Sequence, residues 1–336
     1  MASKPSGGHK ESKSITPATA ARTETVSLTD IDTQDRTYRI TTRNQIEDLL
    51  DTIPSLGLLH PPVLIENTSG YGIVCGFRRI AACRQLGWRM LSARIHAAAQ
   101  DRFQIAQLAI ADNSLQRPLN LIEASRALNL LMDTCPDRHR LEKAALALGL
   151  PVNPSVVTKV QQLCRLAIPI QRGILSDTIH LSMALELGKM DAKDAELLVG
   201  LFSQLKLGLN KQRELLLLVT EIAKREDISI QQLIGEQPLL DMLQKADPDR
   251  AIQRQQIRSL LRQRRYPAIT EAEANYEKQV RQLKLGNQIQ LVPPKDFEGT
   301  TYTLMLHFKN RQGLIHLNAK INEILENPAL GRILKR

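Results

Sequence analysis

Hydrophobic positions divide the chain into stretches of different periodicity. Between Val26 and His96, helical spacing alternates with short aliphatic runs, which predicts a mixed α/β domain. From Asp101 to about Arg225 the strand signals disappear, and helical periodicity interrupted by Gly and Pro predicts an all-helical region. The elements expected in the first stretch are a helix over 44–56, strands over 63–65 and 71–75, a helix over about 77–86 and a strand over 91–96.

A small mixed unit is expected near the C-terminus. Thr270 and Glu273 have capping-box spacing for a helix to about Leu283. Residues 288–292 and 301–308 alternate between apolar and polar positions as strands do. The final helix carries an apolar seam of heptad-like spacing at Leu314, Leu317, Ile321 and Ile324. Because such an α-β-β-α unit has little core of its own, we expect it to form a homodimer.

These patterns, with the composition of the N-terminus, define five segments. The first residues are rich in Ser, Gly, Ala, Pro and Lys, a composition typical of disorder. We therefore expect a disordered tail over 1–25, an α/β domain over 26–115, a helical domain over 116–226, a basic helical connector over 227–268 and a C-terminal domain over 269–336.

Charge and composition narrow the classes of function. The net charge is +10, and nine of these charges fall between Arg250 and Arg336, so a polyanion is a plausible partner, with a solvated basic surface as the alternative. The longest aliphatic run, 215–219, is too short to span a membrane, and no apolar signal segment is visible. Four cysteines without zinc spacing indicate reduced thiols. We expect a cytoplasmic protein without a membrane partner.

The segment 71–88 has the form of a phosphate-binding turn. A strand runs into Gly76 and a helix begins near Phe77, so free backbone N–H groups meet the side chains of Arg78 and Arg79. The alternative is a tight turn with both arginines on a solvated face.

Two further segments offer complementary groups. Upstream, Gly57 ends a helix and Pro61-Pro62 forces an extended chain. Downstream, Asp112 and Asn113 provide hard oxygen ligands of the kind that suits a magnesium-phosphate complex. The alternative for the second segment is a plain helix end followed by an N-cap at Asn120.

In this order, the three segments resemble the N-terminal domain of ParB-family partition proteins, which shares its fold with sulfiredoxin. The resemblance implies a ParB/sulfiredoxin-like fold that binds a nucleotide, usually CTP, with Mg. The residues it implies for the nucleotide are Gly57, Leu58, Leu59, His60, Pro61, Gly76, Phe77, Arg78, Arg79, Asn113, Gln116 and Arg117. The metal ligands it implies are Asp112 and Asn113.

Departures from the family pattern leave the chemistry open. Phe77 stands where the family has a glutamate, and Ala81 stands where it usually has an arginine. Whether the chain is an enzyme is therefore uncertain, and an active one would hydrolyse CTP slowly as a switch. Cys75 lies two residues before the position of the sulfiredoxin catalytic cysteine, so we expect no such reductase.

The helical region contains the spacing of a helix-turn-helix. A helix through Leu141 and Leu148 is followed by a turn over 149–153 and a second helix over 154–165. The residues expected to face a major groove are Ser155, Thr158, Lys159, Gln161 and Gln162. A packed helical pair without DNA contact is the alternative.

Arginines recur every fourth residue in the connector. Arg254, Arg258 and Arg262 lie in a stretch without acidic residues, which predicts a basic stripe along a helix. Unpaired like charges at this spacing repel one another, so we expect contacts with the DNA backbone.

The C-terminal unit and the order of the domains also resemble the ParB family, and imply a ParB-like DNA-binding protein of plasmid or chromosome partition. It would be a nucleotide-switched dimeric clamp on a centromere-like site, associated with the nucleoid. A ParA-type ATPase is a possible partner through the basic residues Lys4, Lys10, Lys13 and Arg22. The alternatives are a transcription regulator with an inert ParB-like domain and a ParB-fold nuclease or nucleotide-dependent enzyme.

Overall fold

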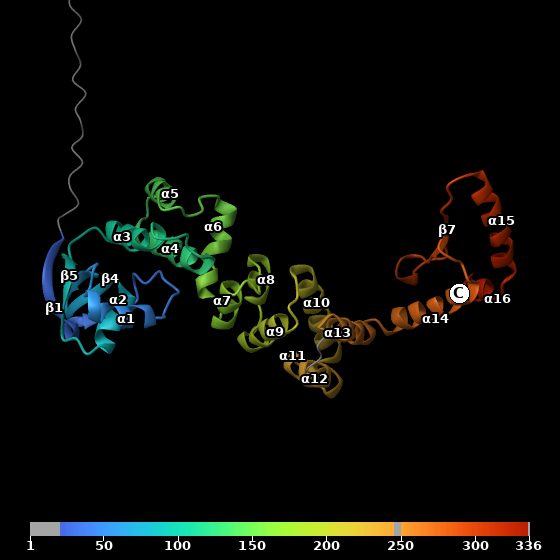
Figure 1. The fold of residues 1–336 in the computed structure, drawn as a ribbon, viewed down its shortest axis with the longest axis horizontal. Helices are drawn as coiled ribbons and strands as arrows, with labels where there is room; N and C mark the ends of the chain where they lie inside the picture. Colours follow the sequence, from blue (N-terminus) through green and yellow to red (C-terminus); the bar gives the residue numbers. More distant parts are fainter. Residues whose placement is uncertain (1–20, 245–249, 335–336) are drawn as a thin grey trace, which may run out of the picture. The chain divides into compact units, whose positions relative to one another are not determined.

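The computed structural model describes residues 21–244 and 250–334 (Figure 1). The chain forms two compact units that divide after Val199. Within the described ranges, no helix combines the length and the apolar character needed to cross a membrane.

A five-stranded sheet organises the start of the first unit. Its strands are β1 (Arg22–Ser27), β2 (Ile31–Asp32), β3 (Val63–Asn67), β4 (Gly70–Cys75) and β5 (Met90–His96), in the order β1-β5-β3-β4-β2. The pairs β1/β5 and β3/β4 are antiparallel, whereas β3/β5 and β2/β4 are parallel. The expected tail is wrong for residues 22–25, which pair with β5. Residues 1–20, including Lys4, Lys10 and Lys13, lie outside the described residues.

Alternating side chains give the sheet two apolar faces. Leu64 and Ile73 belong to the core that includes side chains of α1 (Glu47–Leu56) and α2 (Phe77–Gln85). Val63 and Val74 belong to a second core with α3 (Arg102–Ser114). The strands and helices predicted between residues 44 and 96 are confirmed to within a few residues, and α1 starts at Glu47.

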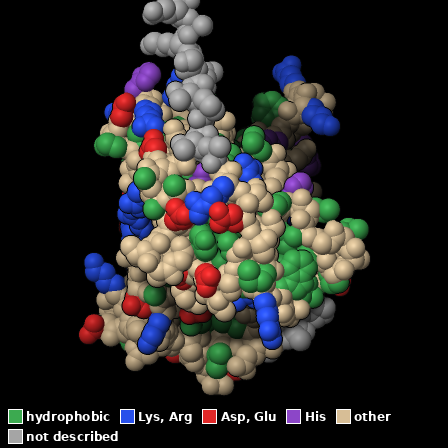
Figure 2. Space-filling model, turned by 90° about the vertical axis from the view of Figure 1, so that its left-hand side faces the viewer, with side chains coloured by type: hydrophobic (Ala, Val, Ile, Leu, Met, Phe, Trp, Pro, Cys, Tyr) green, Lys and Arg blue, Asp and Glu red, His purple; other side chains and the backbone are tan. Residues whose placement is uncertain are grey.

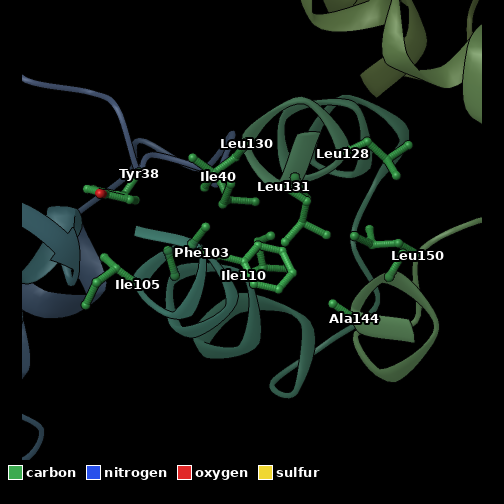
Figure 3. Packing of buried hydrophobic residues seen from close by; sticks show 14 of the residues in the cluster. Tyr38, Ile40, Phe103, Ile105, Ile110, Leu128, Leu130, Leu131, Ala144 and Leu150 are labelled. Carbon is green, nitrogen blue, oxygen red and sulfur yellow. The ribbon is translucent and has the colours of Figure 1, made fainter. Parts of the chain in front are cut away.

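The second core continues into the helical region (Figure 3). The helices that follow are α4 (Leu121–Thr134), α5 (Arg138–Ala147), α6 (Pro154–Gln161), α7 (Ile168–Leu175), α8 (Leu181–Leu187) and α9 (Ala192–Gln204). One buried cluster contains Tyr38, Phe103 of α3, Leu131 of α4 and Ala144 of α5. This core therefore runs across residue 115, the expected end of the first domain, and the predicted domain division stays a prediction.

The second unit contains helices and one small sheet. Its elements are α10 (Leu209–Glu226), α11 (Ile230–Gly235), α12 (Gln237–Gln244), α13 (Arg250–Arg265), α14 (Pro267–Leu283), β6 (Ile289–Val292), β7 (Thr303–Leu306), α15 (Arg311–Glu326) and α16 (Pro328–Leu334). The α-β-β-α unit is confirmed, with β6 and β7 antiparallel and α16 as an additional helix. The capping box is wrong, because Pro267 opens α14 and the Thr270 hydroxyl donates to the Tyr266 carbonyl inside the helix.

Candidate functional site

Three segments far apart in sequence meet at one cavity of the first unit. The cavity has a volume of about 570 Å³, within the range of small-molecule sites. It is lined by every residue predicted to contact a nucleotide or its metal: Gly57, Leu58, Leu59, His60, Pro61, Gly76, Phe77, Arg78, Arg79, Asp112, Asn113, Gln116 and Arg117. The turn at Arg78-Arg79 and the end of α3 thus line the same cavity.

The N-terminus of α2 opens onto this cavity. Gly76 adopts φ +93°, and a Cβ atom there would lie 2.8 Å from the Pro62 Cβ, so only glycine fits. No side chain caps the helix, and the N–H groups of its first turn have no partner within the helix. They lie at the positive end of the helix dipole, an arrangement that suits an anion.

Arg78 and Arg79, both predicted to bind nucleotide, connect chain segments around the cavity. Arg78 donates to the Gln45 carbonyl at 2.5 Å and pairs with Asp48 of α1. Arg79 donates to the His60 carbonyl at 2.6 Å, and its guanidinium lies 3.6 Å from the Asp112 carboxylate. Arg79 therefore joins the loop 57–61 to the end of α3.

Sequence reasoning missed two cationic residues of the same cavity. Arg43 and Arg94 both line it, and neither guanidinium has an ion-pair or hydrogen-bond partner among the residues described here. Arg94 lies on β5 opposite Val63, the first residue of β3, so the parallel pairing of these strands brings it to the Pro61-Pro62 loop. Asp112 is the one carboxylate among the described lining residues, so the cavity carries excess positive charge.

Arg117 lines the cavity with its charge already compensated. Its guanidinium donates to both carboxylate oxygens of buried Glu123, at 2.6 and 2.7 Å. Glu123 also accepts from the Thr42 N–H at 2.9 Å and from the Asn120 N–H at 3.2 Å. Although burial opposes its ionisation, the bonds from Arg117, Thr42 and Asn120 lower the pKa of Glu123 to about 2. We call Thr42, Arg117, Asn120 and Glu123 the Glu123 network.

The oxygen donors suit a metal only together with other ligands. Among the described residues, no group of three or more His, Cys, Asp or Glu side chains could hold a metal ion. The Asn113 amide nitrogen donates to the Ala109 carbonyl at 2.9 Å, which leaves its amide oxygen for another contact. With the nearby Asp112 carboxylate, this donor set fits an Mg²⁺ that takes its other ligands from phosphates and water.

Cysteine chemistry is disfavoured beside the cavity. Burial raises the pKa of the Cys75 thiol far above neutral pH, and it raises that of Cys83 to about 11. Neither side chain is a ready thiolate nucleophile.

The predicted helix-turn-helix residues lie mainly on the surface of α6. Ser155, Thr158, Lys159 and Gln162 are exposed. Gln161 is half-buried, and its carbonyl accepts hydrogen bonds from Ser125 and Asn129 of α4. The end of α6 is thereby fixed to α4, the helix whose first turn contains Glu123.

The premise that the arginines of α13 lack acidic partners is wrong, whereas the expected DNA contacts of Arg254, Arg258 and Arg262 stay a prediction. Arg258 pairs with Glu214 of α10, and Arg262 pairs with Glu273 of α14 at 2.6 Å. Further along, Arg264 pairs with Glu226 and Glu236, and Arg265 with Glu221. Arg254 donates to the Lys206 carbonyl at 3.4 Å. Acidic residues distant in sequence therefore compensate most of these charges, which local spacing could not reveal.

Comparison with known proteins identifies the class of the first domain. Residues 12–113 match the family described as the ParB N-terminal domain. Residues 12–113 are thus similar to ParB N-terminal domains, and the resemblance carried by the three segments is confirmed.

Two curated relatives extend the match beyond this domain. A nucleoid occlusion protein of Oceanobacillus iheyensis is 32% identical over 173 residues, which cover 51% of this chain and 58% of the relative. A probable chromosome-partitioning protein ParB of Campylobacter jejuni is 27% identical over 154 residues, 46% of this chain and 53% of the relative. The chain thus spans little more than half the length of these relatives.

Solved structures of a C-terminally truncated chromosome-partitioning protein ParB from Caulobacter crescentus are also similar. The complex with CTP-gamma-S has a TM-score of 0.23 and 20% identity, and it covers 54% of this chain and 98% of that chain. The complex with the centromeric parS site has a TM-score of 0.30 and 19% identity, and it covers 52% of this chain and 98% of that chain.

Proposed function

We propose that this chain is a ParB-like DNA-binding protein of chromosome or plasmid partition, in which a nucleoside triphosphate acts as a switch. The observation that carries the proposal is the single cationic cavity lined by all three segments of the ParB-like motif. The names of the relatives, nucleoid occlusion and chromosome-partitioning proteins, support a role at the nucleoid.

The cavity residues would divide the nucleotide between them. The open N-terminus of α2, with Arg79 and the uncompensated Arg43 and Arg94, suits the phosphates. The loop 57–61 would contact the base, and Asp112 and Asn113 would hold Mg²⁺ beside the phosphates. The ligand we propose is CTP, as the resemblance implies.

A switch needs a path from this cavity to the DNA-binding helix, and α4 supplies one. Glu123, in the first turn of α4, accepts hydrogen bonds from the Arg117 guanidinium and from the Thr42 N–H. Two turns later, Asn129 donates to the carbonyl of Gln161 at 2.9 Å, at the end of α6. A nucleotide that favours one arrangement of the loop 36–44 would therefore shift the position of α6.

The C-terminal unit supports a homodimer. Leu304 and Met305 of β7 and Leu314 and Ile315 of α15 are exposed, as is Phe308, which is 50% exposed. The hydrophobic core of the C-terminal unit is small, so contact with a second copy of the chain is the simplest way to bury these side chains. A ParA-type ATPase remains a proposed partner, without Arg22, which pairs with Glu24 and Glu66 in the sheet.

Anisotropy of labelled duplex DNA with the full chain, with and without CTP and Mg²⁺, tests the switch. The proposal predicts that the nucleotide changes DNA affinity, and that Arg79→Ala removes this change while DNA binding remains. DNA binding that no nucleoside triphosphate alters would favour a transcription regulator with an inert first domain.

A further inference from the structure

A second groove of the first unit concentrates arginine side chains. It has a volume of about 750 Å³, and its lining includes Arg36, Arg39, Arg102, Arg126 and Arg172, which we call the arginine groove. These residues come from the loop 36–44, α3, α4 and α7, so only the folded unit brings them together. No pattern in the sequence predicts this cluster, because its members are separated by up to 136 residues of chain.

The charge of the arginine groove is not compensated. None of the five arginines pairs with a carboxylate in the part of the chain that the structure describes, and Asp133 is the one acidic residue of the described lining. The guanidinium groups of Arg36, Arg102 and Arg172 also have no hydrogen-bond partner among those residues. A structure that keeps like charges together without counter-charges is suited to a bound polyanion.

The two remaining arginines are fixed in place by neutral groups. Arg126 donates to the carbonyls of Ile40 and Thr41 at 3.3 and 2.9 Å. Arg39 donates to Asn44 at 2.6 Å and lies over the ring of Phe77, 5.6 Å from its centroid. Burial, and in smaller part the charges of Arg36 and Arg126, lower the pKa of Arg39.

Several arginines elsewhere on the chain do have carboxylate partners. Four of the arginines on α13 pair with glutamates of other helices. Seen from the side of β1, the molecule shows acidic and basic side chains next to one another (Figure 2). On β1 itself, Arg22 pairs with Glu24 and Glu66. Arg22 of β1 and four arginines of α13 thus have carboxylate partners, which the five arginines of the groove lack among the described residues.

The position of the arginine groove indicates which polyanion it suits. Asn129, Cys164 and Gln171 also line it, and the Asn129 amide donates to the carbonyl of Gln161, the last residue of α6. Gln171 donates to the Cys164 carbonyl at 3.1 Å. The groove thus adjoins the C-terminal end of the expected recognition helix through Asn129, so a duplex docked on α6 is the polyanion that this position favours.

We propose that the arginine groove binds the phosphodiester backbone of the DNA that α6 contacts. This inference rests on the proposed DNA-binding function and assigns it a surface that the sequence had placed on α13. Contacts to phosphates hold the duplex in register but carry no sequence information. The groove therefore contributes affinity for any duplex sequence.

The test compares two variants of the full chain that lose the same charge. One carries Arg36→Gln, Arg102→Gln and Arg172→Gln, at exposed positions of the groove. The control carries Arg89→Gln, Lys189→Gln and Lys193→Gln, at exposed positions of the same unit outside it. Affinity for a random-sequence duplex is measured across a series of salt concentrations.

We expect the groove variant to bind at least 10-fold more weakly and to lose about 2 to 3 from the slope of log K against log salt, since each phosphate contact contributes about 0.9. The control should keep the wild-type slope, and both variants should bind nucleotide as the wild type does. If the groove variant binds the duplex as the wild type does, or if both variants lose affinity equally, the proposed role of the groove is overturned. The proposal that the chain binds DNA would still stand. Failure of the wild-type chain to bind any duplex would overturn the proposed function as well.

Discussion

At the scale of single residues, the distinction that matters is between arginines with and without a carboxylate partner. Arg78 and Arg117 lie at the nucleotide cavity but already pair with Asp48 and Glu123. Arg43 and Arg94 have no such partner in the described chain, so their full charge is available to an anion. We therefore expect the two arginines that the sequence did not single out to contribute most to phosphate affinity.

Replacement of Arg94 tests this expectation. Arg94→Gln should weaken nucleotide binding about 10- to 100-fold, because a hydrogen bond to a charged group contributes about 1.5–3 kcal/mol. Arg84→Gln is the matched control, since Arg84 donates to Thr33 at 2.7 Å and does not line the cavity. Isothermal titration calorimetry measures both, and equal affinities for the two variants would contradict the assignment.

Glu123 provides a prediction on pH. Because its pKa is about 2 in the folded chain and 4.5 is its ordinary value, the stability it contributes is fully present above about pH 4.5 and is lost as pH falls towards 2. In Glu123→Gln this loss should be absent. At neutral pH the free energy of unfolding of the variant should be about 3 kcal/mol lower than that of the wild type, because Arg117 loses its buried partner.

Urea unfolding between pH 7 and pH 2.5 measures both effects. Glu196→Gln serves as the control, because Glu196 is exposed and makes no ion pair in the described structure. A parallel pH dependence in wild type and Glu123→Gln would show that the Glu123 network does not stabilise the fold.

At the scale of elements, the junction of β4 and α2 determines the cavity. Gly76 ends the strand in a left-handed conformation and lets the first turn of α2 face the open space. The chain passes so close to Pro62 that the turn and the loop 57–61 position each other.

A side chain at this junction should disrupt both structure and binding. Gly76→Ala combines a positive φ with a contact of 2.8 Å to Pro62, whereas Gly87→Ala has φ +75° and open space around it. We expect about 1 kcal/mol of destabilisation for Gly87→Ala, more for Gly76→Ala, and loss of nucleotide binding only for the latter. Thermal unfolding and a nucleotide titration distinguish them, and normal binding by Gly76→Ala would contradict this account.

The sequence predicted elements well and long-range partners poorly. The helix after Gly76 and the strands around it follow from local periodicity, whereas the convergence of three segments on one cavity was implied by the family resemblance. The bond between Thr42 and Glu123 joins residues 81 positions apart, so no spacing rule can reveal it. For the same reason the arginines of α13 looked unpaired, although glutamates of α10 and α14 compensate them.

At the scale of the whole molecule, the exposed apolar side chains of the C-terminal unit indicate self-association. Phe308→Asp and Ile315→Asp replace side chains that are 50% and 53% exposed, so the protomer should stay folded. Burial of a carboxylate in the subunit interface is costly, and the double variant should sediment as a monomer where the wild type is a dimer. A monomeric wild-type chain at micromolar concentration would contradict the homodimer.

The claim on which the account rests is that the cavity between α2 and the end of α3 binds a nucleoside triphosphate. Calorimetric titration of the full chain with ATP, CTP, GTP and UTP, with and without Mg²⁺, tests it most directly. We predict saturable binding of CTP that Mg²⁺ strengthens and that the double substitution Arg79→Ala with Arg94→Gln abolishes. The absence of heat for all four nucleotides, or binding that the double variant retains, would contradict the claim.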